Sequence, residues 1–333
     1  MSAFYRRLAP SLLGLFIVCS PAPSEPNAGA DPDLFAGRRL LQDVVPDTNN
    51  LIQYHGRGLT AAEYDVQKRS ELEEFDTVLK QKFGNGFRLH ATKHFNIACE
   101  CNRAQMRQLE EWITVFYESV YPRYFRYEIN RTFRIIYFAN RTRFIRITGM
   151  EVYGFYRSYE QTLYTYVGSG PGTLWHELVH AFIAANSRRT YVRQWFDEGF
   201  ASFYEMAAVR NGTFFEGYTN WRHPALRAAI RDKKLLPLRA ALRGERLAPE
   251  FGYAGARFFF CYLWINGWME KFVQAYLYEI LPRYPADQLD AAIHAQLEII
   301  SGMSLEEMER DYHRLALELE KNQKLNRMRQ VAR

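Results

Sequence analysis

The feature that most constrains this chain is a pair of histidines one helical turn apart. His176 and His180 stand in the sequence HELVH, within the apolar run TLWHELVHAFIAA. Residues four apart on an α-helix project from the same face, so both imidazoles can reach one ion. If this run is a helix, the pattern predicts a metal site on it.

Two glutamates complete the predicted site. Zinc held by two histidines needs a third protein ligand and keeps a fourth position for water. Glu198, eighteen positions after His180 on the next predicted helix, is the candidate ligand. Glu177 lies about 100° round the helix and can approach the open side of the ion. There it can take the proton from water as the hydroxide attacks a carbonyl. The sequence therefore predicts His176, His180 and Glu198 as Zn²⁺ ligands and Glu177 as the catalytic base.

The motif resembles a known group of enzymes. HELVH, seventeen intervening residues and Glu198 in WFDEGFASFYE are similar to the gluzincin metallopeptidases, the clan of thermolysin and the alanyl-type aminopeptidases. The wider layout resembles the peptidase MA-like metallopeptidases. The specific part covers residues 173–205, and the looser layout covers about 87–320. The resemblance implies a zinc peptidase that acts on a peptide or protein substrate.

The chain also departs from that pattern. The aminopeptidases usually separate the second histidine and the glutamate by one residue more. They also carry an upstream G-x-M-E-N motif that holds the amino terminus of the substrate. Gly149-Met150-Glu151 is a fragment of it without the spacer or the asparagine, and it lies closer to the histidine pair. No substrate-binding role is therefore assigned to Glu151, and the choice between endopeptidase and exopeptidase stays open.

Further site residues follow from the resemblance. Gluzincins use a downstream tyrosine or histidine to stabilise the oxyanion, which points to Tyr253 in GYAGARFFFCYL. With 22 tyrosines in the chain, packing in the core is the alternative for Tyr253. Asp197 or Ser202 could orient a zinc-ligand imidazole. The strand at residues 163–167 stands where gluzincins keep an edge strand, so it could pair with an extended substrate or be core sheet.

A second histidine pair has the same spacing. His90 and His94 lie in FRLHATKHFNIA, whose pattern predicts a strand. In one strand they would be about 13 Å apart along the chain, too far to chelate one ion. The spacing alone thus predicts no metal site here.

Residues 1–24 have the features of a secretory signal peptide. Arg6 and Arg7 precede a short apolar run that ends at Val18, before small and proline-rich residues. The run is too short to cross a bilayer, so we expect a secreted or periplasmic protein without a stable membrane anchor. The formal net charge of +6 falls by two when the signal arginines are removed, and the remaining basic residues are scattered. We therefore expect no nucleic-acid partner; the oligomeric state is open.

The remaining sequence predicts an α+β fold, with a strand-containing N-terminal subdomain packed on a helical C-terminal subdomain and the HELVH helix between them. Residues 25–58 are rich in Pro, Asp, Asn and Gly and suggest a linker or arm. The catalytic domain is then 59–330, with an α+β subdomain at 59–170 and a helical subdomain at 171–330. A capping box, Thr60 to Glu63, begins the first helix.

Finer expectations concern individual elements. Thr173 is the predicted N-cap of the HELVH helix. The helical part contains segments with a helical apolar pattern at 198–209, 224–242, 253–265, 270–281, 287–299 and 305–324. Once the signal is removed, Cys99, Cys101 and Cys261 remain. We interpret them as structural, with their pairing open.

Two rivals to a peptidase remain. One is a catalytically inactive extracellular binding module that keeps a structural zinc. The other is a carbohydrate-binding surface, suggested by 22 tyrosines and 24 phenylalanines, although no repeat or cluster supports it. Chelator-sensitive peptide cleavage separates the peptidase from the binding module.

Overall fold

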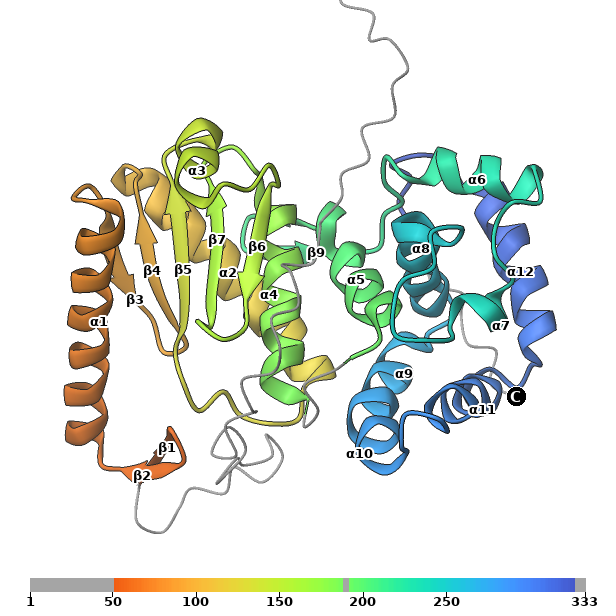
Figure 1. Ribbon diagram of the computed structural model, residues 1–333, viewed down its shortest axis with the longest axis horizontal. Helices are drawn as coiled ribbons and strands as arrows, with labels where there is room; N and C mark the ends of the chain where they lie inside the picture. Colours follow the sequence, from red (N-terminus) through yellow and green to blue (C-terminus); the bar gives the residue numbers. More distant parts are fainter. Residues whose placement is uncertain (1–50, 188–191, 327–333) are drawn as a thin grey trace, which may run out of the picture.

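The computed structural model describes residues 51–187 and 192–326. A strand-rich region and a helical region lie side by side, with α4 and α5 between them (Figure 1). This confirms the predicted α+β class, with strands in the N-terminal region and helices in the C-terminal region. The expected signal peptide at 1–24 and most of the expected linker lie outside the described residues.

The main sheet has five strands in the order β3-β4-β5-β7-β6. The strands are β3 (Arg88–Ala91), β4 (Phe95–Cys99), β5 (Phe133–Phe138), β6 (Gly154–Arg157) and β7 (Thr162–Tyr166). The three central strands are parallel, and the two outer strands run antiparallel to their neighbours. Of the two possibilities for residues 163–167, the edge strand is wrong and the core sheet is confirmed, because β7 pairs with β5 on one side and with β6 on the other. Among the described strands, the edge strand beside β7 is β6.

Helices cover both faces of this sheet. On one face α1 (Ala61–Phe83) and α3 (Arg141–Thr148) enclose a small core. On the other face α2 (Arg103–Tyr124) and α4 (Pro171–Asn186) belong to a larger core that continues through the helical region. Neighbouring residues of β4 separate these two cores, since Ile97 lies in the larger and Ala98 in the smaller. The helix that bears the histidine pair is therefore anchored in the core that joins both halves.

The N-terminal elements extend further than expected. The capping box of α1 is present as predicted, with Thr60 and Glu63 bonded to each other's backbone N–H groups. Before it, β1 (Ile52–Tyr54) and β2 (Arg57–Leu59) form a hairpin within the expected linker. Tyr54 is 2% exposed, and its hydroxyl contacts Glu71 and Thr132. Residues 52–59 thus form a hairpin that is tied to α1, and the bounds expected for the linker or arm stay a prediction.

The start of α4 differs by three residues from the expectation. Its N-cap is Gly170, whose φ of 82° suits glycine, and Pro171 occupies the first turn. Proline is favoured there because its fixed φ is helical and the first N–H groups need no helical partner. Thr173 lies inside the helix, where its hydroxyl donates to the Ser169 carbonyl at 3.1 Å. The prediction of Thr173 as N-cap is wrong.

The C-terminal region is mainly helical. Its helical elements are α5 (Gln194–Phe203), η3 (Tyr204–Met206), α6 (His223–Arg231), α7 (Leu238–Ala241), α8 (Gly252–Ile265), α9 (Met269–Ala275), η4 (Tyr276–Ile280), α10 (Leu281–Arg283), α11 (Leu289–Ser301) and α12 (Leu305–Glu318). The helix expected at 198–209 gives way to a hairpin of β8 (Ala208–Arg210) and β9 (Thr213–Phe215). Its turn is Asn211-Gly212, both with positive φ. The helix expected at 224–242 is broken into α6 and α7.

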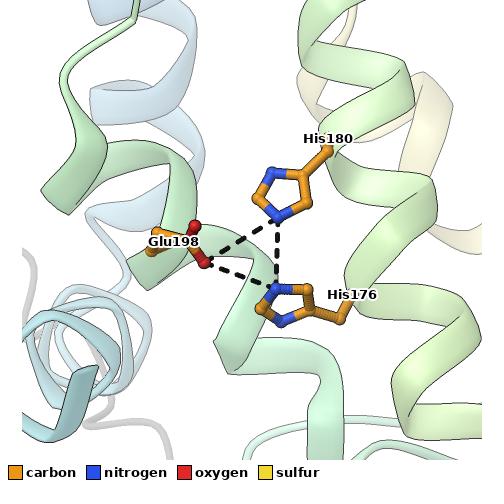
Figure 2. A group of neighbouring side chains, drawn as sticks. All are labelled: His176, His180 and Glu198. Atoms are coloured by element: carbon orange, nitrogen blue, oxygen red, sulfur yellow. Dashed lines mark hydrogen bonds and ion pairs between the residues drawn. The ribbon is translucent and has the colours of Figure 1, made fainter. Parts of the chain in front are cut away.

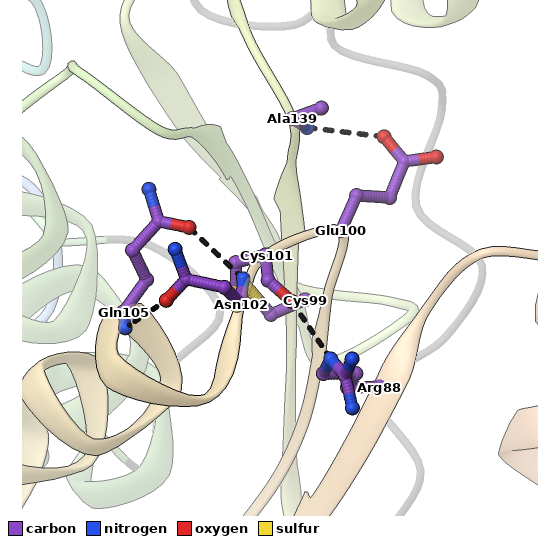
Figure 3. The surroundings of a disulfide bond; sticks show 7 residues. All are labelled: Arg88, Cys99, Glu100, Cys101, Asn102, Gln105 and Ala139. Atoms are coloured by element: carbon purple, nitrogen blue, oxygen red, sulfur yellow. Dashed lines mark hydrogen bonds between the residues drawn. A yellow bond between two sulfur atoms is a disulfide. The ribbon is translucent and has the colours of Figure 1, made fainter.

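Cys99 and Cys101 form a disulfide, which answers the question of pairing (Figure 3). The bond lies at the corner where β4 leads into α2, and Asn102 caps that helix. Arg88 of the neighbouring strand donates to the Cys101 carbonyl at 2.9 Å. Cys261 is a free thiol buried in α8. Among the described residues, we find no helix with the length and apolarity needed to cross a membrane.

Candidate metal centre

The histidine pair and the predicted third ligand converge. Figure 2 shows His176 and His180 of α4 pointing toward Glu198 of α5. The two Nε2 atoms lie 3.1 Å apart. The Glu198 Oε2 lies 3.4 Å from Nε2 of His176 and 3.8 Å from Nε2 of His180. The three atoms thus form a compact triangle between the two helices.

This triangle has the size of one face of a zinc coordination sphere. With zinc–ligand bonds of about 2.0–2.1 Å in a tetrahedron, neighbouring ligand atoms are separated by about 3.4 Å. The Oε2 atom of Glu198 is also buried without a hydrogen-bond partner among the described residues. A buried carboxylate oxygen without a hydrogen bond is costly in free energy, and a cation at the centre of the triangle would remove that cost. The donor set therefore fits a metal ion.

Close helix packing places Glu198 at this position. A Cβ on the next residue, Gly199, would lie 2.8 Å from the Ala256 carbonyl and from the Phe260 ring of α8. A Cβ on Gly172 would lie 2.1 Å from the Glu205 carbonyl. Glycine at these two positions lets α5 approach α8 and lets α4 approach the end of α5. A larger residue at position 199 would push α5 away from α8, and one at position 172 would push α4 away from the segment that follows α5.

Each histidine also faces a carboxylate through its second nitrogen. Nδ1 of His180 lies 2.7 Å from Oδ1 of Asp197. Asp197 thus has the place expected of a residue that orients an imidazole. The hydroxyl of the other candidate, Ser202, is buried and has no hydrogen-bond partner within the described part of the chain. Nδ1 of His176 instead lies 3.4 Å from Oε1 of Glu205.

The sequence reasoning missed Glu205. The residue follows Glu198 by seven positions, a spacing that would share one face of an α-helix, and it lies in η3, directly after the end of α5. Its side chain is 10% exposed, and its other oxygen contacts Arg222 and Asn220. An acidic residue repeated at this spacing was the available signal.

Burial and the surrounding carboxylates shift the pKa values of this cluster. Burial lowers the pKa of each histidine, but nearby carboxylates outweigh it. Glu198 and Glu205 raise the pKa of His176 well above its usual value, and Asp197 and Glu198 raise that of His180 to about 9. With Glu177, four acidic side chains surround two imidazoles. Such an excess of negative charge favours a divalent cation.

Glu177 lies beside the ligands and is 5% exposed. Burial raises the pKa of its carboxyl, while His176 and His180 lower it. The backbone N–H of Tyr156, in the edge strand β6, donates to this carboxylate. Glu177 is thus held between the ligand cluster and the free edge of the sheet. A carboxylate at this place can accept a proton from water at the ligand cluster.

The other predicted residues are not part of the ligand triangle. Tyr253 is in the first turn of α8, and its ring centroid is 5.7 Å from the Arg222 guanidinium. Its role toward an oxyanion stays a prediction. Glu151 is exposed before β6. His90 and His94 are separated by the turn of the β3–β4 hairpin, so the expectation of a single strand is wrong. Within the described residues, only His176, His180 and Glu198 form a group of three or more potential ligands.

No family model matches the chain, and no curated protein matches its sequence. Among solved structures, one similar chain is a mutant of an M1 zinc metallopeptidase from Deinococcus radiodurans. The two share 12% identity with a TM-score of 0.39, over 68% of this chain and 51% of that one. This chain thus spans about half the length of that enzyme. What we infer about the chemistry rests on the geometry of the ligand cluster.

Proposed function

We propose that this chain is a zinc-dependent peptidase of gluzincin type that acts outside the cytoplasm. His176, His180 and Glu198 would bind Zn²⁺, and Glu177 would be the general base. The observation that carries the proposal is the triangle of two Nε2 atoms and one Oε2 atom, with sides of 3.1, 3.4 and 3.8 Å. The extracytoplasmic location rests on the signal-like sequence at residues 1–24.

The cluster suits hydrolysis of an amide. Zinc held by two histidines and a carboxylate supplies a Lewis acid that polarises a carbonyl and lowers the pKa of water. Glu177 accepts the proton that water loses on attack and then delivers it to the leaving nitrogen. Burial supports this role, because it raises the pKa of Glu177 toward the operating pH. Tyr253 is the proposed donor to the oxyanion.

The free edge of the sheet suggests the substrate class. Within residues 51–187 and 192–326, β6 pairs with β7 on one side only, and its Tyr156 N–H reaches Glu177. An extended peptide that adds to this edge by backbone hydrogen bonds would pass beside the general base. A peptide or protein is therefore the proposed substrate. The strand that would pair with it is β6, whereas the sequence analysis had suggested residues 163–167.

A variant of the general base tests the proposal. Glu177→Gln preserves the size of the side chain and lies outside the ligand triangle, so bound zinc should stay at the wild-type level. Hydrolysis of a mixed peptide library should fall by about 10²- to 10⁴-fold, the range expected for loss of a general base. Glu151→Gln is the matched control. It makes the same change at an exposed glutamate upstream of the HELVH motif, so this variant should keep the wild-type peptidase activity.

Two outcomes would contradict the proposal. A Glu177→Gln protein with full, chelator-sensitive activity would exclude Glu177 as the base. A wild-type protein that binds one zinc ion and cleaves no peptide in the library would instead be a binding module with a structural metal. Cleavage products identified by mass spectrometry also separate endopeptidase from exopeptidase action.

A further inference from the structure

Glu205 is a buried carboxylate with two different partners. Its Oε1 lies 3.4 Å from Nδ1 of His176, while its Oε2 contacts Arg222 and lies 3.1 Å from Nδ2 of Asn220. The two donors on Oε2 restrict the rotation of the carboxylate, because they hold that oxygen from two directions. Oε1 is consequently held facing the imidazole whose other nitrogen belongs to the ligand triangle.

The two donors lie on a loop with its own internal support. Oδ1 of Asn220 accepts a hydrogen bond from the Arg222 backbone at 2.9 Å, so the same amide orders the loop and contacts Glu205. The Arg222 guanidinium lies 4.8 Å from the Trp221 ring and 5.7 Å from the Tyr253 ring. Contacts with two aromatic rings restrict the movement of the guanidinium. The side chain of Arg222 is therefore held in place by contacts other than its contact with Glu205.

The C-terminal segment holds this loop from the other side. The Thr219 N–H donates to the Gln323 carbonyl at 2.9 Å, and the Gln323 N–H donates to the Thr219 hydroxyl at 2.8 Å. The Leu325 N–H donates to the Gly217 carbonyl at 2.8 Å. A loop attached in this way has little freedom to carry Arg222 away from Glu205.

We propose that Arg222 is a positioning residue for the metal centre, acting through Glu205 on His176, with Asn220 as its partner on the same loop. Arg222 lies outside the ligand triangle and contacts Glu205. It fixes the carboxylate that orients the imidazole, and an imidazole held in one orientation binds metal more tightly than a free one. This inference rests on the metal centre of the proposed function and does not require peptidase activity.

Zinc affinity of the full chain, measured by competition with a chelating dye, tests this inference. Arg222→Gln should weaken zinc binding by about 10- to 100-fold, the usual effect of removing a group that orients a ligand. Arg222→Lys should recover part of that loss, since it restores one charged donor. Arg239→Gln is the matched control, because Arg239 is 42% exposed and pairs with Glu306 and Glu298 away from the centre; it should leave the affinity unchanged.

A second measurement separates positioning from general stability. The visible absorption of the Co²⁺-substituted protein reports ligand geometry, and Arg222→Gln should change it. If Arg222 acts through Glu205, the double variant Glu205→Gln/Arg222→Gln should bind zinc no more weakly than Glu205→Gln alone. Fully additive losses, or an Arg222→Gln protein with wild-type affinity and spectrum, would overturn the inference. A wild-type protein that binds no zinc would instead refute the metal centre itself.

Discussion

This molecule contains two histidine pairs with the same spacing, one on a helix and the other divided between a strand and a turn. His176 and His180 lie on one helix, with their Nε2 atoms 3.1 Å apart. His90 lies in β3 and pairs with Glu110 of α2 at 2.9 Å, while His94 lies at the turn before β4 with its ring 4.8 Å from Tyr117. A spacing of four residues makes a chelating pair only where the backbone is helical. The secondary structure that carries the two histidines, more than their spacing in the sequence, therefore decides whether they can bind one metal ion.

Removal of one histidine from each pair should give the largest contrast. His180→Ala removes a ligand, so zinc content measured by atomic emission should fall from one ion per chain to a small fraction of that. His90→Ala should leave zinc content unchanged, because His90 contacts Glu110 and lies outside the ligand group. Loss of zinc in the His90 variant would mean that the β3–β4 hairpin takes part in the metal centre.

The second contrast concerns protonation of His94. Burial, with help from Lys93 and Lys68, lowers the pKa of His94 to about 3. Below about pH 6.5 the unfolded chain binds a proton at this position and the folded chain does not. The free energy of unfolding is thus highest, as far as this group is concerned, above about pH 6.5, and it decreases as the pH falls toward 3. Between pH 7 and pH 5 the loss should be about 2 kcal/mol.

Urea unfolding at both pH values measures this loss. His94→Gln should reduce the change in free energy of unfolding between pH 7 and pH 5, because the variant lacks the group that titrates. His90→Gln is the matched control and should retain the wild-type change. Equal pH dependence in all three proteins would show that His94 is not the group responsible.

The next contrast lies within the metal centre. Asp197 contacts His180 at 2.7 Å with a side chain that is 33% exposed, whereas Glu205 faces His176 with a side chain that is 10% exposed. Water screens the more exposed carboxylate. Asp197→Asn should therefore weaken zinc binding by about tenfold, toward the lower end of the range for such groups. We expect a smaller loss of zinc affinity for Asp197→Asn than for Glu205→Gln. A larger loss for Asp197→Asn, in the same dye competition, would contradict this expectation.

The sequence predicted those parts of the centre that depend on local periodicity. An apolar run with helical spacing places His176 beside His180, and a second helix makes Glu198 available. The edge position of β6 was missed because strand order depends on pairing between distant segments. Arg222 and its loop were missed for a similar reason, since their contact with Glu205 depends on packing against the C-terminal segment.

The smallest effect should come from the ion pair of His90 itself. His90 and Glu110 have side chains that are 34% and 39% exposed, and a pair so accessible to water and salt contributes little. His90→Ala should change the free energy of unfolding by less than about 1 kcal/mol at pH 7. The loss at His94 on acidification should be larger, although the two histidines are four residues apart. Urea unfolding in low and high salt measures the difference, and a larger effect at His90 would mean that burial does not separate the two positions energetically.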